Sequence, residues 1–93
     1  MKNLKLKKIR IKLDKLDNKM LGIIKKRTFL VNQILKQKKY KKDIVDKKRI
    51  KFILSRIRTK SIKNKIDPKI TNKIWKSMIN SYINYEIRNF KKK

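Results

Sequence analysis

The 93-residue sequence contains no cysteine and no histidine. These two absences exclude disulfide bonds, thiol chemistry, and metal or acid–base sites built on imidazole. No stretch approaches the ~18 apolar residues of a membrane span. The start, MKNLKLKKIRIKL, alternates lysine with apolar residues and offers no apolar run for a signal peptide. We therefore expect a cytoplasmic protein.

Acidic residues are scarce, since six Asp and Glu accompany 32 Lys and Arg, for a net charge of +26. Such a charge favours nucleic acid as a partner. The lysines are spread over every segment, however, and aromatic residues do not alternate with them as a single-strand-binding surface requires. Lysine, isoleucine and asparagine are all overused, as a coding bias toward AT-rich codons would produce. We interpret the charge mainly as solvated surface, with weak, salt-sensitive binding to polyanions.

The stretch from Arg10 to Lys38 has the pattern of one long amphipathic helix, beginning near Leu4 and continuing to about Lys39. Two cations, Arg27 and Lys38, fall on its apolar face. A cation on a buried face is costly unless an anion meets it there. The apolar residues of this face, spaced by three and four, are Leu6, Ile9, Leu13, Leu16, Met20, Ile23, Ile24, Leu30, Val31 and Ile34.

The length of this helix predicts an oligomer. A chain of 93 residues forms one domain at most. About 55 further residues are too few to cover a helix of roughly 35 residues, and uncapped patterns longer than about 25 residues indicate a coiled coil or an intertwined partner. The simplest expectation is a homodimer.

A second helix is predicted after the polar segment KYKKD at residues 39–43. Either Asp43 or Asp46 is suited to cap it. Asp46 and Arg49 lie one turn apart, where a simple ion pair is the alternative to a functional role. The apolar face of this helix consists of Ile50, Ile53, Leu54 and Ile57.

A third helix is predicted from Asp67-Pro68 to about Phe90. Asp at the N-cap accepts a free backbone N–H, and proline at the first helical position presets φ. Glu86, the only glutamate, falls on an apolar and aromatic row of this helix. A carboxyl group there is either the partner of a buried cation or a group with a chemical role. The predicted fold class is all-α, with three helices per chain and a long first helix.

These fragments, in this order and spacing, resemble the all-helical (type II) chorismate mutase family over nearly the whole chain. The matching fragments are Ile9-Arg10, Leu16-Asp17, Arg27, Lys38, Ile44-x-Asp46-x-x-Arg49, Ile66-Asp67-Pro68, and Ile74-Trp75-x-x-Met78-Ile79 followed by Glu86. The resemblance implies that residues 1–93 are a single helical domain and that two chains form an intertwined six-helix homodimer with two shared active sites. It also implies conversion of chorismate to prephenate, on the way to phenylalanine and tyrosine, without a cofactor.

The resemblance further implies a set of substrate-binding residues. Arg10 of the partner chain and Arg27 of the home chain would hold the substrate carboxylates. Lys38 would contact the ether oxygen and a carboxylate, and Glu86 would lie at the ether oxygen. The implied catalytic residues are Lys38, Glu86 and Arg27, and the implied substrate-binding residues are Arg10, Arg27, Lys38, Asp46, Arg49, Tyr82 and Glu86.

The chemistry of this reaction agrees with the composition. A Claisen rearrangement occurs within one molecule and needs no nucleophile, metal or redox cofactor, so the lack of histidine and cysteine is no obstacle. The site must hold a flexible diacid in its reactive conformer and stabilise charge that develops on the ether oxygen. Arginine binds carboxylates bidentately, and Lys38 supplies positive charge at the breaking bond.

Four residues depart from the family pattern. Ile50 stands where relatives usually have Glu, which accepts a hydrogen bond from the ring hydroxyl, and Tyr82 stands where many have Ser. Lys65 replaces the usual Gly before the third helix. Glu86 stands where many members have Gln, and it must be protonated to donate a hydrogen bond to the ether oxygen.

Three other functions remain open at this stage. An isochorismate–pyruvate lyase of the same fold would use a similar cationic pocket. A non-catalytic or catalytically weak relative is suggested by Ile50. A small basic nucleic-acid-binding protein belongs to another class, but such a protein gains nothing from Arg27, Lys38 and Glu86 on apolar faces.

Overall fold

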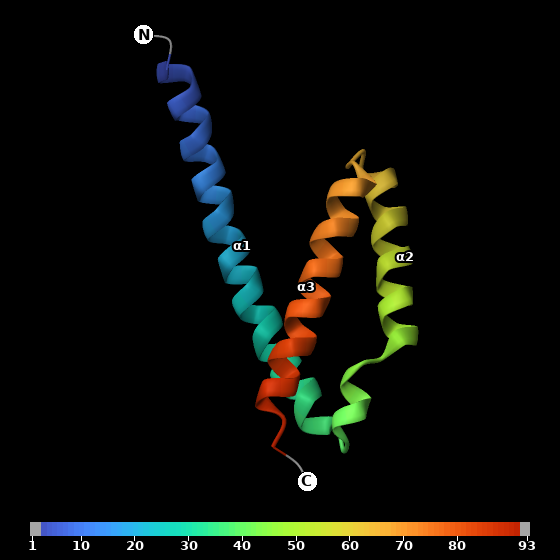
Figure 1. Ribbon diagram of the computed structural model, residues 1–93. Coiled ribbons are helices and arrows are strands. Elements are labelled where there is room, and N and C mark those ends of the chain that lie inside the picture. The colour runs from blue at the N-terminus through green and yellow to red at the C-terminus, as the bar shows by residue number, and fades with distance from the viewer. Residues whose placement is uncertain (1–2, 92–93) are drawn as a thin grey trace. The chain divides into compact units, whose positions relative to one another are not determined.

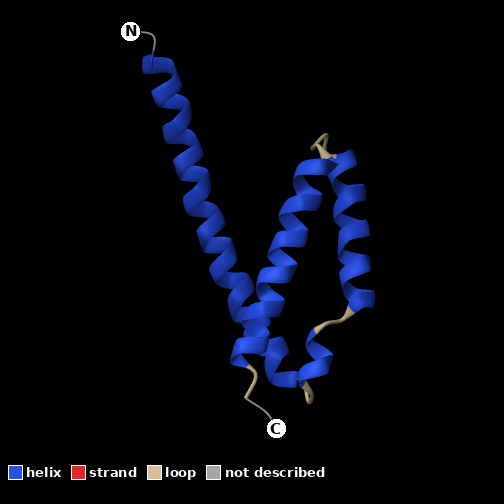
Figure 2. Cartoon of the chain, viewed as in Figure 1, coloured by secondary structure: helices blue, strands red, loops and turns tan. Residues whose placement is uncertain are grey.

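The computed structural model describes residues 3–91 of the chain. Its elements are three α-helices and one short 3₁₀ helix, and no strand occurs within residues 3–91 (Figures 1 and 2). The all-α class and the long first helix are therefore confirmed. The elements are α1 (Asn3–Gln37), η1 (Lys41–Ile44), α2 (Lys47–Lys63) and α3 (Pro68–Asn89).

The chain divides into two compact units, residues 1–33 and residues 34–93. The described part of the first unit is helix α1 as far as Gln33. The apolar face of the whole helix α1, whose residues from Ile34 onward belong to the second unit, is open to solvent in the single chain, because nine of its large side chains are 43–56% exposed. These nine are Leu6, Ile9, Leu13, Leu16, Met20, Ile23, Ile24, Leu30 and Ile34.

The second unit is built around the α2–α3 hairpin, whose two helices lie side by side (Figure 1). The third helix begins as the sequence predicts: Oδ1 of Asp67 accepts a hydrogen bond from the backbone N–H of Lys69 at 2.9 Å, and Pro68 is at the start of the helix. Lys65, in the connection, has φ of 58°, the left-handed conformation that glycine adopts more easily. Lysine therefore occupies the family's usual glycine position at some cost in backbone strain.

A buried hydroxyl joins the two helices of the hairpin. Ser61 is 3% exposed, and its Oγ lies 2.7 Å from Oγ1 of Thr71 on α3. The same hydroxyl donates to the backbone oxygen of Ile57 at 2.6 Å. Both polar groups are thus satisfied where α2 and α3 approach each other.

The connection between α1 and α2 contains a 3₁₀ turn, which the periodicity of the sequence did not predict. Helix α1 ends at Gln37, two residues before the predicted end, and η1 follows from Lys41 to Ile44. Ile44 is 4% exposed, and η1 packs against α3. Ile44 and Leu35 are the only buried apolar side chains within residues 3–91, so this corner is where the single chain has its core.

Within the described residues, no helix is both long enough and apolar enough to cross a membrane.

Candidate active site

Glu86 lies on α3 with only 8% of its surface exposed. Its Oε2 atom is buried and has no hydrogen-bond partner among the described residues. Burial raises the pKa of Glu86 above its ordinary value of 4.5, and the positive charge of Lys38 partly opposes that rise. Buried polar atoms are nearly always paired in native proteins, so an unpaired carboxyl oxygen marks a place where a ligand atom would be stabilised.

Lys38 follows the last turn of α1 and is half-buried. Its Nζ donates to the backbone oxygen of Asp43 at 2.8 Å and lies 3.5 Å from that of Ile44. An ammonium group has three N–H donors. Two are directed at backbone oxygens, which leaves one for another acceptor, while the charge acts on Glu86. The structure thus brings together the cation and the carboxyl group that the sequence singled out.

Asp46, and not Asp43, is the N-cap of α2. Its Oδ1 accepts a hydrogen bond from the backbone N–H of Arg49 at 3.0 Å. The guanidinium of Arg49 lies over the ring of Phe52, 5.5 Å from its centroid, and Arg56 lies at the same distance. The carboxylate of Asp46 therefore bonds the backbone of Arg49, and the side chain of Arg49 stacks on an aromatic ring.

Two further positions of interest lie on the hairpin. Tyr82 is one turn before Glu86 on α3, is half-buried, and meets Tyr85 edge to face with 6.4 Å between ring centroids. Ile50 is half-buried in the first turn of α2, where its backbone N–H donates to the oxygen of Asp46 at 3.0 Å. The side chain of Ile50 offers no acceptor for a substrate hydroxyl.

The remaining predicted residues, Arg10 and Arg27, belong to the first unit. Both are exposed side chains of α1. The second unit therefore contains Lys38, Asp46, Arg49, Tyr82 and Glu86, and α1 carries the two arginines that the resemblance assigns to the substrate carboxylates.

Sequence reasoning missed two residues around this site. Asp43 appeared only as a possible helix cap, yet its backbone oxygen holds Lys38. Phe52 was not singled out, yet it stacks with Arg49 and Arg56. The spacing of Arg49, Phe52 and Arg56 by three and four residues was the available signal for that stack.

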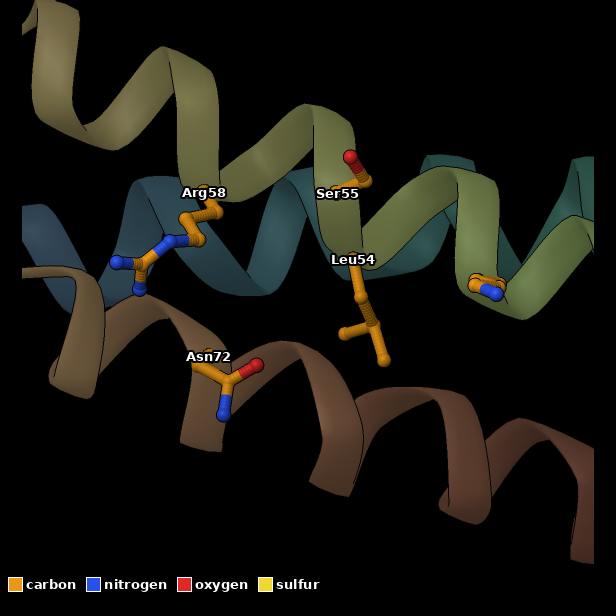
Figure 3. Close-up of a pocket in the computed structure, with 5 residues that line it drawn as sticks. Leu54, Ser55, Arg58 and Asn72 are labelled. Carbon is orange, nitrogen blue, oxygen red and sulfur yellow. The ribbon is translucent and has the colours of Figure 1, made fainter.

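A separate pocket of about 340 Å³ lies along the α2–α3 hairpin. In Figure 3, Leu54 and Arg58 of α2 extend toward α3, which carries Asn72. Lys51 and Ser55 complete the lining, and none of the five is a predicted site residue. Two of the five lining residues are cations, which is close to the share of Lys and Arg in the whole sequence, 32 of 93 residues. The lining is therefore not enriched in positive charge. This pocket is therefore not the candidate site.

Comparison with known proteins identifies the class of this all-helical chain. The family model described as chorismate mutase type II matches residues 9–87. The chain belongs to the chorismate mutase type II family, as the resemblance indicated. No curated protein and no solved structure gives a significant match.

Proposed function

We propose that this protein is a chorismate mutase that rearranges chorismate to prephenate. The observation that carries the proposal is the buried Glu86 with its unpaired Oε2 beside the Lys38 ammonium, within the region matched by the family model. Two groups at one ether oxygen, one a cation and the other a carboxylic acid whose O–H donates a hydrogen bond, would stabilise the charge that develops as the C–O bond breaks. This is complementarity to the transition state by placed charges.

Protonated Glu86 would donate a hydrogen bond to the ether oxygen, and the third N–H of Lys38 would donate to the same oxygen or to a carboxylate. Arg27, and Arg10 from a second chain, would bind the two carboxylates and hold the compact reactive conformer. Asp46 and Arg49 would line the site near the ring, as the resemblance implies, and Tyr82 would take the place where many family members have Ser. The scheme needs no nucleophile.

The proposal includes an intertwined homodimer, in which residues 1–93 of each chain form a single domain. The exposed apolar face of α1 supports it, since the nine side chains named above are each about half exposed in the single chain. Burial of the area that is still exposed on these side chains would contribute about 1 kcal/mol for each side chain, on the order of 10 kcal/mol per protomer. That magnitude is comparable to the cost of association. A second chain is also the source of Arg10 in the proposed site.

The direct test is incubation of the purified protein with chorismate at moderate salt, following loss of chorismate and formation of prephenate. Arg27→Ala should abolish nearly all turnover, on the order of a 100-fold loss or more, because the carboxylate clamp contributes to orientation. Lys26→Ala is the matched control, since it removes an equal charge from the neighbouring position on α1. Helical content and sedimentation should be unchanged in both. Undiminished turnover in Arg27→Ala would refute the clamp.

Ile50 favours one second candidate, a catalytically weak relative of the same fold. The half-buried Ile50 gives the substrate hydroxyl no acceptor, which would cost about 1–3 kcal/mol if that hydroxyl is buried and unpaired. A well-folded protein that turns over neither chorismate nor isochorismate would support this candidate. Release of pyruvate from isochorismate, without prephenate from chorismate, would identify the lyase activity instead.

A further inference from the structure

The Lys38 ammonium is held by the turn that follows it in the chain. Its hydrogen bonds go to backbone oxygens five and six residues ahead, on Asp43 and Ile44. The backbone N–H of Lys38 itself donates to Leu35 at 3.2 Å, so the start of this side chain is fixed by the last turn of α1. The backbone of Lys38 is thus fixed by α1 and its ammonium group is held by η1, so the position of the charge depends on the conformation of η1.

The conformation of η1 depends in turn on the carboxylate of Asp43. Its Oδ2 accepts a hydrogen bond from the backbone N–H of Tyr40 at 3.2 Å, and its own N–H donates to the oxygen of Tyr40 at 3.0 Å. These reciprocal bonds close the turn in the manner of a capping box. On the other side, the buried Ile44 anchors η1, which packs against α3, the helix that carries Glu86.

We propose that Asp43 is a positioning residue of the candidate site, whose carboxylate fixes η1 so that the turn's backbone oxygens hold the Lys38 ammonium beside Glu86. The inference rests on the proposed function for its catalytic consequence. Asp43 acts on Lys38 through the backbone, and its carboxylate contacts no substrate. An ammonium group that is already held in position stabilises a developing charge without moving during the reaction. A lysine that rotates among its rotamers must first lose that conformational freedom, which costs free energy.

The single glutamate of the protein makes the position of Lys38 measurable. Glu86 is the only Glu in 93 residues, so selective ¹³C labelling of glutamate yields one side-chain carboxyl resonance. Lys38 is the one charged group within residues 3–91 that shifts the pKa of Glu86. Other charged groups lie on the neighbouring elements, namely Lys41, Lys42 and Asp43 of η1 and Asp46 and Lys47 at the start of α2. Burial raises the pKa of Glu86 and the Lys38 charge lowers it, so at unchanged burial a shift in this pKa reports a change in the position of the Lys38 ammonium.

The experiment compares the pH titration of this resonance in the full chain and in three variants. Asp43→Ala removes the acceptor for Tyr40, releases Lys38, and should raise the pKa of Glu86 above the wild-type value. Asp43→Asn keeps an acceptor oxygen but removes the charge, and it should titrate like wild type. Asp67→Ala is the matched control, because it removes a comparable side chain–backbone bond at the other end of the α2–α3 hairpin and should leave the pKa unchanged.

Two results would overturn the inference. One is a Glu86 titration in Asp43→Ala that coincides with wild type. The other is an equal shift in Asp43→Asn, which would make the charge of Asp43, and not its hydrogen bond, the cause. If Asp43→Ala does not fold, hydrogen exchange in the wild-type protein still tests the hydrogen bond between Tyr40 and Asp43. The Tyr40 amide should be protected from exchange. Exchange at the rate of an unstructured peptide would contradict the proposed turn.

Kinetics separate this inference from the proposed function. With chorismate as substrate, Asp43→Ala should lower kcat by roughly 10- to 100-fold with a smaller change in KM, because a misplaced ammonium affects the transition state more than substrate binding. Asp43→Asn should restore the rate. Absence of turnover in the wild-type protein would refute the proposed function, while the Glu86 titration would still decide whether Asp43 positions Lys38.

Discussion

Replacing Glu86 by Gln tests whether the reaction depends on a protonated carboxyl group. Only the neutral acid donates a hydrogen bond to the ether oxygen, whereas Gln donates at any pH. Burial raises the pKa of Glu86 above 4.5 and Lys38 partly opposes the rise, so part of the population stays protonated above pH 4.5. Wild-type kcat/KM should therefore be highest at low pH.

The size of the effect follows from proton binding. Above the pKa of Glu86, each further pH unit reduces the protonated fraction about tenfold, and wild-type kcat/KM should fall by the same factor. The Glu86→Gln profile should stay flat over that range. The ratio of variant to wild-type kcat/KM should consequently rise about tenfold per pH unit. Measurement of initial rates with chorismate across the pH range, at constant ionic strength, checks this. Parallel profiles for the two proteins would refute the assigned role.

The same carboxyl group affects folding stability. Because the pKa of Glu86 is higher in the folded protein, the folded state binds its proton more tightly than the unfolded chain does. This contribution is fully present below pH 4.5, the ordinary pKa, and is lost as pH rises through the folded-state pKa. Urea unfolding should show that loss in wild type and not in Glu86→Gln. Equal pH dependence of stability in the two proteins would contradict the burial of a neutral acid.

Two further predictions concern the dimer and the ring hydroxyl. Leu16→Glu places a charge on the exposed apolar face of α1 and should convert the proposed dimer to monomers in sedimentation experiments. Asn18→Glu adds the same charge away from that face and should leave the proposed dimer intact. A dimeric Leu16→Glu variant would contradict the proposed interface. Ile50→Glu supplies the missing acceptor and should raise kcat/KM with chorismate by roughly 5- to 100-fold, and an unchanged value would show that the hydroxyl finds another partner.

The positions of the helices were predictable because the relevant forces are local. The three- and four-residue spacing of apolar side chains predicted α1 and α2, and Asp67-Pro68 predicted the start of α3, which the structure confirms. The two candidate caps before α2 were not separable from sequence. Asp43 and Asp46 both precede the helix, and only the backbone path through η1 assigns one carboxylate to Tyr40 and the other to Arg49.

The sequence by itself also marked Lys38 and Glu86 as polar residues on apolar faces, because helical periodicity assigns each residue to a face. Their relationship was beyond such reasoning. It depends on the packing of η1 against α3, and on the burial that leaves Oε2 of Glu86 without a partner. Hydrogen bonds between neighbours in the chain are encoded in short stretches of sequence. The burial and pKa of Glu86 arise from groups almost fifty residues apart, which only the folded unit brings together.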